Sequence, residues 1–127
     1  MIYLDTSVAL AHLLGETRVP PPMLWEASLV SSRLLEYELW TQIHGGGLAK
    51  THAEVVRALL AEVSFLELTP IVVARAVEPF PLPVRTLDAL HLASIEFLRT
   101  QRRDVRLASY DERMLRVAQA LGIPIFE

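Results

Sequence analysis

Four acidic residues in this 127-residue chain lie where predicted strands or helices turn toward one shared edge of a small α/β domain. They are Asp5, Glu38, Asp88 and Asp111. Two full charges about 4 Å apart repel by roughly 4 kcal/mol at an effective dielectric constant of about 20, so converging carboxylates need a bound cation or bound protons. Hard divalent cations such as Mg²⁺ and Mn²⁺ suit carboxylate oxygens best. Periodicity does not choose between Glu38 and Glu36, because both interrupt the apolar arc of the same predicted helix.

Each acid taken alone also has a purely structural explanation. Asp5 and Asp111 each follow an apolar strand and precede a helix, which is typical of N-caps, and residues 109–112 have capping-box spacing. Asp88 alone is typical of an acid in the first turn of a helix. Open α/β sheets bind ligands at the carboxyl edge of their strands, so three acids together at that edge favour a shared site. His91 is interpreted as a packed side chain with a local hydrogen bond, the alternative being a contact with RNA or a metal.

Short apolar segments alternate with helical patterns along the whole chain. We expect strands at residues 2–4, 29–31, 65–68, 106–109 and 123–126, the last of them limited in its pairing by Pro124. We expect helices at residues 8–14, 33–43, 52–63, 71–77, 87–99 and 112–121, a brief helix at 23–27 and an extended proline-rich segment at 79–83. Because each crossover returns the chain to the same edge, this alternation predicts a three-layer α/β/α fold with a mostly parallel sheet of four to five strands.

Composition limits the classes of protein and site. The length and the 52% hydrophobic content fit one domain over residues 1–127. The absence of cysteine excludes disulfides and thiolate-bound zinc. No apolar run approaches the ~20 residues of a membrane span and no secretory signal is visible, so we expect a cytoplasmic protein without a membrane partner. The net charge of -3 argues against a general polyanion-binding surface but permits a local one.

Four short motifs carry a resemblance to a known family. They are Asp-Thr-Ser at residues 5–7, Ser-Arg-Leu-x-x-x-Glu-Leu at 32–39, Leu-Asp-Ala-Leu-His-Leu-Ala at 87–93 and Ser-Tyr-Asp-Glu-Arg at 109–113. In this order they resemble the motifs of PIN-domain ribonucleases, specifically the VapC-type toxins of toxin-antitoxin pairs. The resemblance covers essentially the whole chain, and the last two motifs are its most specific parts. Ser109 stands where threonine is commoner in the family.

The resemblance implies a catalytic centre and a reaction. It assigns the catalytic and metal-ligand positions to Asp5, Glu38, Asp88 and Asp111, and so favours Glu38 over Glu36. Thr6, Ser7 and Ser109 would hydrogen-bond and orient those carboxylates. One or two Mg²⁺ or Mn²⁺ ions would lower the pKa of a water that hydrolyses an RNA phosphodiester, leaving a 5'-phosphate and a 3'-hydroxyl.

Partners follow from the same resemblance. It implies a small antitoxin protein whose C-terminal segment lies across the acidic groove, and a homodimer. Arg113 or Arg116 is a candidate for contact with the RNA substrate, the alternative being that both lie on a solvated helix face.

Two rival classes of function are considered beside the nuclease. Receiver and phosphatase-like domains need a lysine near the acidic site, whereas Lys50, the single lysine, falls in a glycine-rich turn outside every acidic motif. The more serious rival is a PIN fold kept as a protein-binding module with weak or no catalysis. Acids at all four motif positions argue against that rival.

Overall fold

A four-stranded, fully parallel sheet forms the centre of the molecule, in the order β3-β2-β1-β4. The computed structural model describes residues 1–101 and 103–127. The strands are β1 (Ile2–Leu4), β2 (Leu29–Ser32), β3 (Val63–Leu66) and β4 (Arg106–Ala108). In the register of the sheet, Ile2 of β1 is paired with Leu29 on one side and with Arg106 on the other. The carboxyl ends of β1 and β4 therefore lie side by side.

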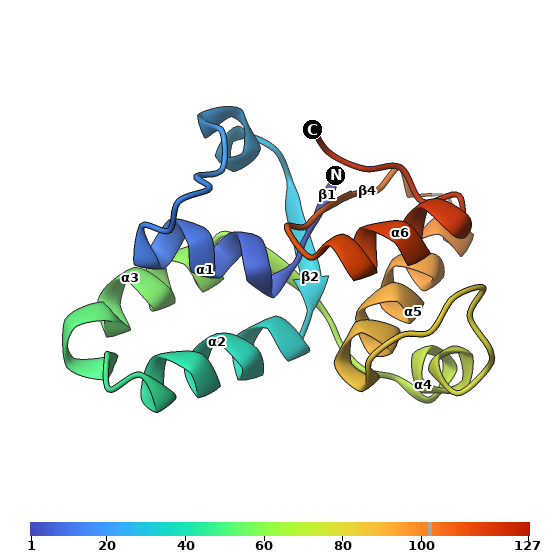
Figure 1. Ribbon diagram of the computed structural model, residues 1–127, viewed down its shortest axis with the longest axis horizontal. Coiled ribbons are helices and arrows are strands. Elements are labelled where there is room, and N and C mark those ends of the chain that lie inside the picture. Colours follow the sequence, from blue (N-terminus) through green and yellow to red (C-terminus); the bar gives the residue numbers. More distant parts are fainter. Residues whose placement is uncertain (102) are drawn as a thin grey trace.

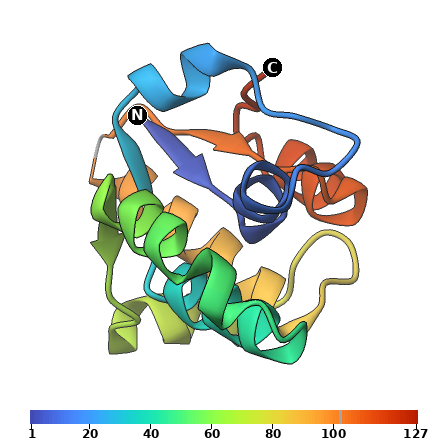
Figure 2. The same cartoon turned by 90° about the vertical axis from the view of Figure 1, so that its left-hand side faces the viewer.

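Helices cover both faces of this sheet. They are α1 (Thr6–Leu14), the 3-10 helix η1 (Pro22–Glu26), α2 (Leu34–Gly45), α3 (Ala49–Ala61), α4 (Pro70–Ala76), α5 (Thr86–Thr100) and α6 (Glu112–Ala120). Helices α1, α2 and α3 lie on one side of the strands, and α4, α5 and α6 lie on the other (Figure 1). Viewed from the side of α2 and α3, α5 lies behind the sheet (Figure 2). The predicted three-layer α/β/α fold is thus confirmed. No helix in the described part of the chain has the length and apolarity to cross a bilayer.

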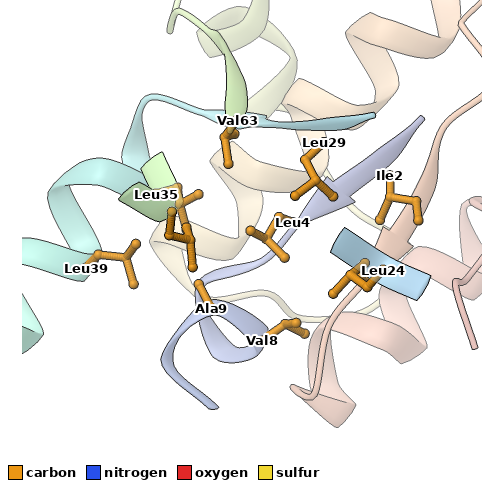
Figure 3. Packing of buried hydrophobic residues seen from close by; sticks show 11 residues of the cluster. Ile2, Leu4, Val8, Ala9, Leu24, Leu29, Leu35, Leu39 and Val63 are labelled. Atoms are coloured by element: carbon orange, nitrogen blue, oxygen red, sulfur yellow. The ribbon is translucent and has the colours of Figure 1, made fainter. Parts of the chain in front are cut away.

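The sheet separates two hydrophobic cores. Side chains alternate between the faces of a strand, so Ile2 and Leu4 enter one core while Tyr3 enters the other. The first core joins β1 to α1, α2, α3 and η1, with Leu35 and Leu39 fully buried (Figure 3). The second core is made largely by α5 and α6 packing on β1 and β4. Both cores meet at β1, which places the residue after β1 at the centre of the fold.

Local signals set several helix boundaries. The Asp5 carboxylate caps α1 through the backbone N–H of Ser7, and the Asp111 carboxylate caps α6 through the N–H groups of Arg113 and Met114. Capping of this kind satisfies backbone donors that have no partner within the helix. Gly15 ends α1 in the left-handed region, at a φ of 62°, a conformation that glycine adopts without steric cost.

Three predicted elements differ most from the observed ones. The strand predicted at residues 65–68 is β3, Val63–Leu66, and the helix predicted at 52–63 is α3, Ala49–Ala61. The helix predicted at 52–63 ends earlier because Val63 belongs to the first core as a strand residue. The strand predicted at 123–126 is reduced to a single bridge between Leu107 and Ile125. Pro124 has no N–H to donate and so limits this ladder.

Candidate active site

The four predicted acids line one pocket at the carboxyl edge of the sheet. The pocket has a volume of about 500 Å³, and its lining includes Asp5, Glu38, Asp88 and Asp111. Asp5 follows β1 and Asp111 follows the neighbouring β4, while Glu38 comes from α2 and Asp88 from the first turn of α5. The structure therefore brings together side chains from four separated segments. We call this cavity the acid pocket.

Two serine hydroxyls hold the carboxylate of Asp5. Ser7 Oγ donates to Asp5 Oδ2 at 2.5 Å and Ser109 Oγ donates to the same oxygen at 2.8 Å. Each hydroxyl also accepts a backbone N–H, from Tyr110 in the case of Ser7 and from Asp111 in the case of Ser109. Because these N–H donors leave each hydroxyl proton to point at Asp5, the carboxylate is fixed in one orientation. Ser7 and Ser109 therefore both hydrogen-bond to Asp5, and their role beside a metal ligand stays a prediction.

Thr6, the third predicted hydroxyl, behaves differently. It lines the acid pocket, but its Oγ1 is buried without a hydrogen-bond partner among the described residues. In this conformation Thr6 orients no carboxylate.

Arg85 joins two of the acids and was missed by the sequence analysis. Its Nε donates to Asp88 Oδ2 at 3.2 Å, and its Nη2 contacts Asp111 Oδ2. The other oxygen of Asp111 is occupied in capping α6. The spacing of three residues between Arg85 and Asp88 is a signal that could have revealed one of these contacts. The contact with Asp111 spans 26 positions in the chain and has no local signal.

The electrostatics of Asp88 reflect this convergence of charge. Burial raises the pKa of Asp88, and the nearby negative charges of Asp111 and Asp5 raise it further. Arg85 opposes the upward shift only in part. Burial and the charges of Asp111 and Asp5 together therefore disfavour the ionised form of Asp88.

Glu38 is the last member of a buried series of hydrogen-bonded side chains. His91 Nε2 lies 2.5 Å from Glu38 Oε1, and His91 Nδ1 lies 2.6 Å from the hydroxyl of Tyr3. The Tyr3 oxygen in turn accepts the backbone N–H of Ser32 at 3.1 Å. Burial lowers the pKa of His91, but the hydrogen bond and the charge of Glu38 outweigh that effect and the net shift is upward. His91 is packed and hydrogen-bonded as expected, but its partners lie 53 and 88 positions away in the sequence instead of nearby.

The ambiguity between Glu36 and Glu38 is resolved by position. Glu38 lines the acid pocket, whereas Glu36 lies on the outside of α2, where its carboxylate pairs with Arg33 at 3.5 Å. Periodicity missed this distinction because α2 packs against the fold on more than one face.

The donor chemistry of the acid pocket fits a hard divalent ion. Its charged ligands are carboxylate oxygens, which Mg²⁺ and Mn²⁺ prefer. Among the described residues, no three His, Asp or Glu side chains are yet close enough to enclose an ion. The guanidinium of Arg85 lies between Asp88 and Asp111 instead, on a side chain that is 59% exposed. In this structure Arg85 supplies the positive charge at these two carboxylates, and Asp5, Glu38, Asp88 and Asp111 are the residues that would hold an ion.

Comparisons with known proteins agree with this architecture. The sequence profile of the PIN domain matches residues 2–120. A solved toxin-antitoxin complex from Klebsiella pneumoniae contains a chain that superposes with a TM-score of 0.60 at 16% identity, covering 91% of this chain and 90% of that one. At that identity the likeness concerns the fold alone. No curated protein sequence matches the chain.

The Tyr3 hydroxyl generates a prediction about stability. In Tyr3→Phe, the Ser32 N–H and the His91 ring lose a buried partner, so we expect the free energy of unfolding to fall by about 1–3 kcal/mol. Tyr37→Phe is the matched control, because Tyr37 is 61% exposed and its hydroxyl can be solvated in either state. Urea unfolding of both variants measures the difference. Equal stabilities of the two variants would show that the hydrogen bonds of the Tyr3 hydroxyl contribute nothing to the free energy of unfolding.

Proposed function

The chain belongs to the PIN domain family, and we propose that it is a Mg²⁺- or Mn²⁺-dependent endoribonuclease that acts in the cytoplasm as the toxin of a toxin-antitoxin pair. PIN domains are generally nucleases that use divalent metals. The observation that carries the proposal is the meeting of all four motif acids in one pocket at the carboxyl edge of the sheet.

In Asp5 and Glu38, hydrogen bonds within the fold engage one carboxylate oxygen, and the other oxygen remains for a ligand. The hydrogen bonds that Asp5 accepts in the described residues all go to Oδ2, and Glu38 binds His91 through Oε1. Asp5 and Asp111 are the proposed direct metal ligands, and Asp88 and Glu38 complete the site directly or through water. Ser7 and Ser109 keep Asp5 from rotating away.

The proposed reaction is hydrolysis without a covalent enzyme intermediate. A water attacks the phosphorus of an RNA phosphodiester, the bond to the 3'-oxygen breaks, and a 5'-phosphate and a 3'-hydroxyl result. When bound, a divalent ion lowers the pKa of the attacking water and stabilises the leaving oxygen. The carboxylates of the acid pocket would hold that ion, and its charge would offset their repulsion of the phosphate.

Substitution of the proposed ligands tests the activity. We expect Asp5→Asn and Asp111→Asn each to lower the rate of Mg²⁺- or Mn²⁺-dependent RNA cleavage by about 100-fold or more, because loss of groups that only orient metal ligands already costs about 10–100-fold. Glu112→Gln is the control, an exposed acid beside Asp111 that does not line the acid pocket.

Cleavage of labelled RNA, with folding checked by thermal unfolding, measures these rates. Metal-independent cleavage, or wild-type rates in both Asn variants, would contradict the mechanism. A well-folded wild-type chain without any cleavage would favour the alternative, an inactive PIN-fold module that binds proteins.

Arg85 generates a prediction about the metal itself. Because its guanidinium already neutralises Asp88 and Asp111, it competes with a divalent ion for the same carboxylates. We expect Arg85→Gln to tighten Mn²⁺ binding by about two- to fivefold, the range over which one exposed ion pair shifts an equilibrium. Arg57→Gln, on α3, is the matched control. Calorimetric titration with Mn²⁺ measures the affinity, and weaker binding by Arg85→Gln would show that Arg85 assists the ion.

The proposed protein partner is a small antitoxin that covers the acid pocket. The contacts of Arg85 support this part of the proposal, because they demonstrate that a guanidinium fits between Asp88 and Asp111. A partner arginine would make the same contacts from outside. The solved complex that shares the fold is a toxin with its antitoxin. We also propose a homodimer.

Co-expression with the product of the neighbouring gene tests the partnership. We expect the two chains to purify together and RNA cleavage to be suppressed until they are separated. Light scattering of the isolated chain should give twice its mass of 14.3 kDa. A chain that cleaves RNA freely and does not bind the product of the neighbouring gene would contradict the toxin assignment. A monomeric mass would contradict the proposed dimer.

A further inference from the structure

A second pocket adjoins the acid pocket. It has a volume of about 350 Å³ and lies between the proline-rich segment that precedes α5 and the first turns of α6. Arg85 and Asp88 line both cavities, so the two share a wall. Arg113 and Arg116 line the second pocket as well. We call it the arginine pocket.

The lining of the arginine pocket combines apolar surface with positive charge. Its apolar part comes from Leu82 and Val84 on one side and from Met114 on α6 on the other. Arg113 and Arg116 are three positions apart on α6, which places them on one face of the helix. Within a chain of net charge -3 this is a local concentration of positive charge. The one acid in the lining, Asp88, is already paired with Arg85.

The wall that carries Leu82 and Val84 is stiff. Pro79, Pro81 and Pro83 restrict the backbone, and this stretch has neither helix nor strand, as the sequence predicted. Phe80 anchors it beneath the guanidinium of Arg75, whose carbon lies 4.2 Å from the ring centre. A wall that is ordered in advance loses little conformational entropy when a ligand binds.

We propose that the arginine pocket binds the RNA nucleotide next to the phosphodiester cleaved in the acid pocket. A nucleotide pairs a flat, largely apolar base with an anionic phosphate, which matches an apolar lining flanked by guanidinium groups. The volume of the pocket lies in the range of small-ligand sites. Arg113 and Arg116 hold the phosphate, Leu82 and Val84 contact the base, and the shared wall makes the bound nucleotide continuous with the scissile one.

This inference rests on the proposed nuclease function and adds to it a site for affinity and base preference. It also replaces the alternative of a solvated helix face for Arg113 and Arg116. The two pockets have opposite charge. One phosphate of an RNA strand can therefore lie at the acid pocket, where a metal ion neutralises the carboxylates, and the next phosphate can contact the arginines.

The test of the phosphate contact uses a chain that binds RNA without cutting it. In an Asp5→Asn background with Mn²⁺, we expect Arg116→Gln to raise the Kd for a fluorescent single-stranded oligoribonucleotide about fivefold. The slope of log affinity against log salt should also fall by about 0.7, the value for one phosphate contact on a single strand. Arg57→Gln is the matched control, since it removes an equal charge on α3, away from both pockets.

The test of the base contact uses oligoribonucleotides with one abasic position. We expect a loss of affinity of about threefold when the missing base flanks the cut, smaller than an aromatic stacking contact provides. In Leu82→Ser, whose parent side chain is 43% exposed, that loss should disappear. Val77→Ser is its control, because Val77 is 80% exposed and lines neither pocket.

The outcomes separate the inference from the function on which it rests. Normal wild-type cleavage, together with an RNA affinity of Arg116→Gln equal to that of Arg57→Gln, overturns the nucleotide site alone. Loss of antitoxin binding in Arg116→Gln with unchanged RNA affinity also overturns it and assigns the pocket to the protein partner. A wild-type chain that cleaves no RNA with any divalent ion overturns the proposed function and the nucleotide site with it.

Discussion

Repulsion among carboxylates is the constraint that the fold has to satisfy. The carboxyl ends of β1 and β4 set Asp5 beside Asp111, and helices α2 and α5 add Glu38 and Asp88 to the same cavity. Burial raises the pKa of Asp88, and the neighbouring charges of Asp111 and Asp5 raise it further, so this arrangement is unfavourable by itself. The chain relieves it from within, chiefly through the guanidinium of Arg85.

Packing keeps these charges in place. Serine hydroxyls bound to backbone N–H groups hold the Asp5 carboxylate, and the Tyr3–His91 pair ties Glu38 to the second core. Both Tyr3 and His91 are fully buried, so Glu38 cannot move without disturbing the interface between β1 and α5. The rigidity that a metal site needs therefore comes from the two cores that meet at β1.

Arg85 connects the acid pocket with the arginine pocket. Its side chain is exposed, it contacts two acids, and it lines both the acid pocket and the arginine pocket. Arg85 thus lies at the boundary between a cavity lined by acids and a cavity lined by arginines. This pairing suits a substrate that brings its own negative charge to a metal, as a polynucleotide does.

The sequence alone determined the alternation of strands and helices, the parallel sheet and the strand-end positions of Asp5 and Asp111, because these depend on local periodicity and on the rule that parallel strands end at one edge. Periodicity could not determine which face of α2 reaches the pocket and left Glu36 and Glu38 equal, whereas the family resemblance favoured Glu38. Only the tertiary structure placed Arg85 between two acids, since Asp111 lies 26 positions from Arg85 and the two meet through packing. Packing also decided where α3 ends and β3 begins, because burial of Val63 in the first core overrides the local helical pattern.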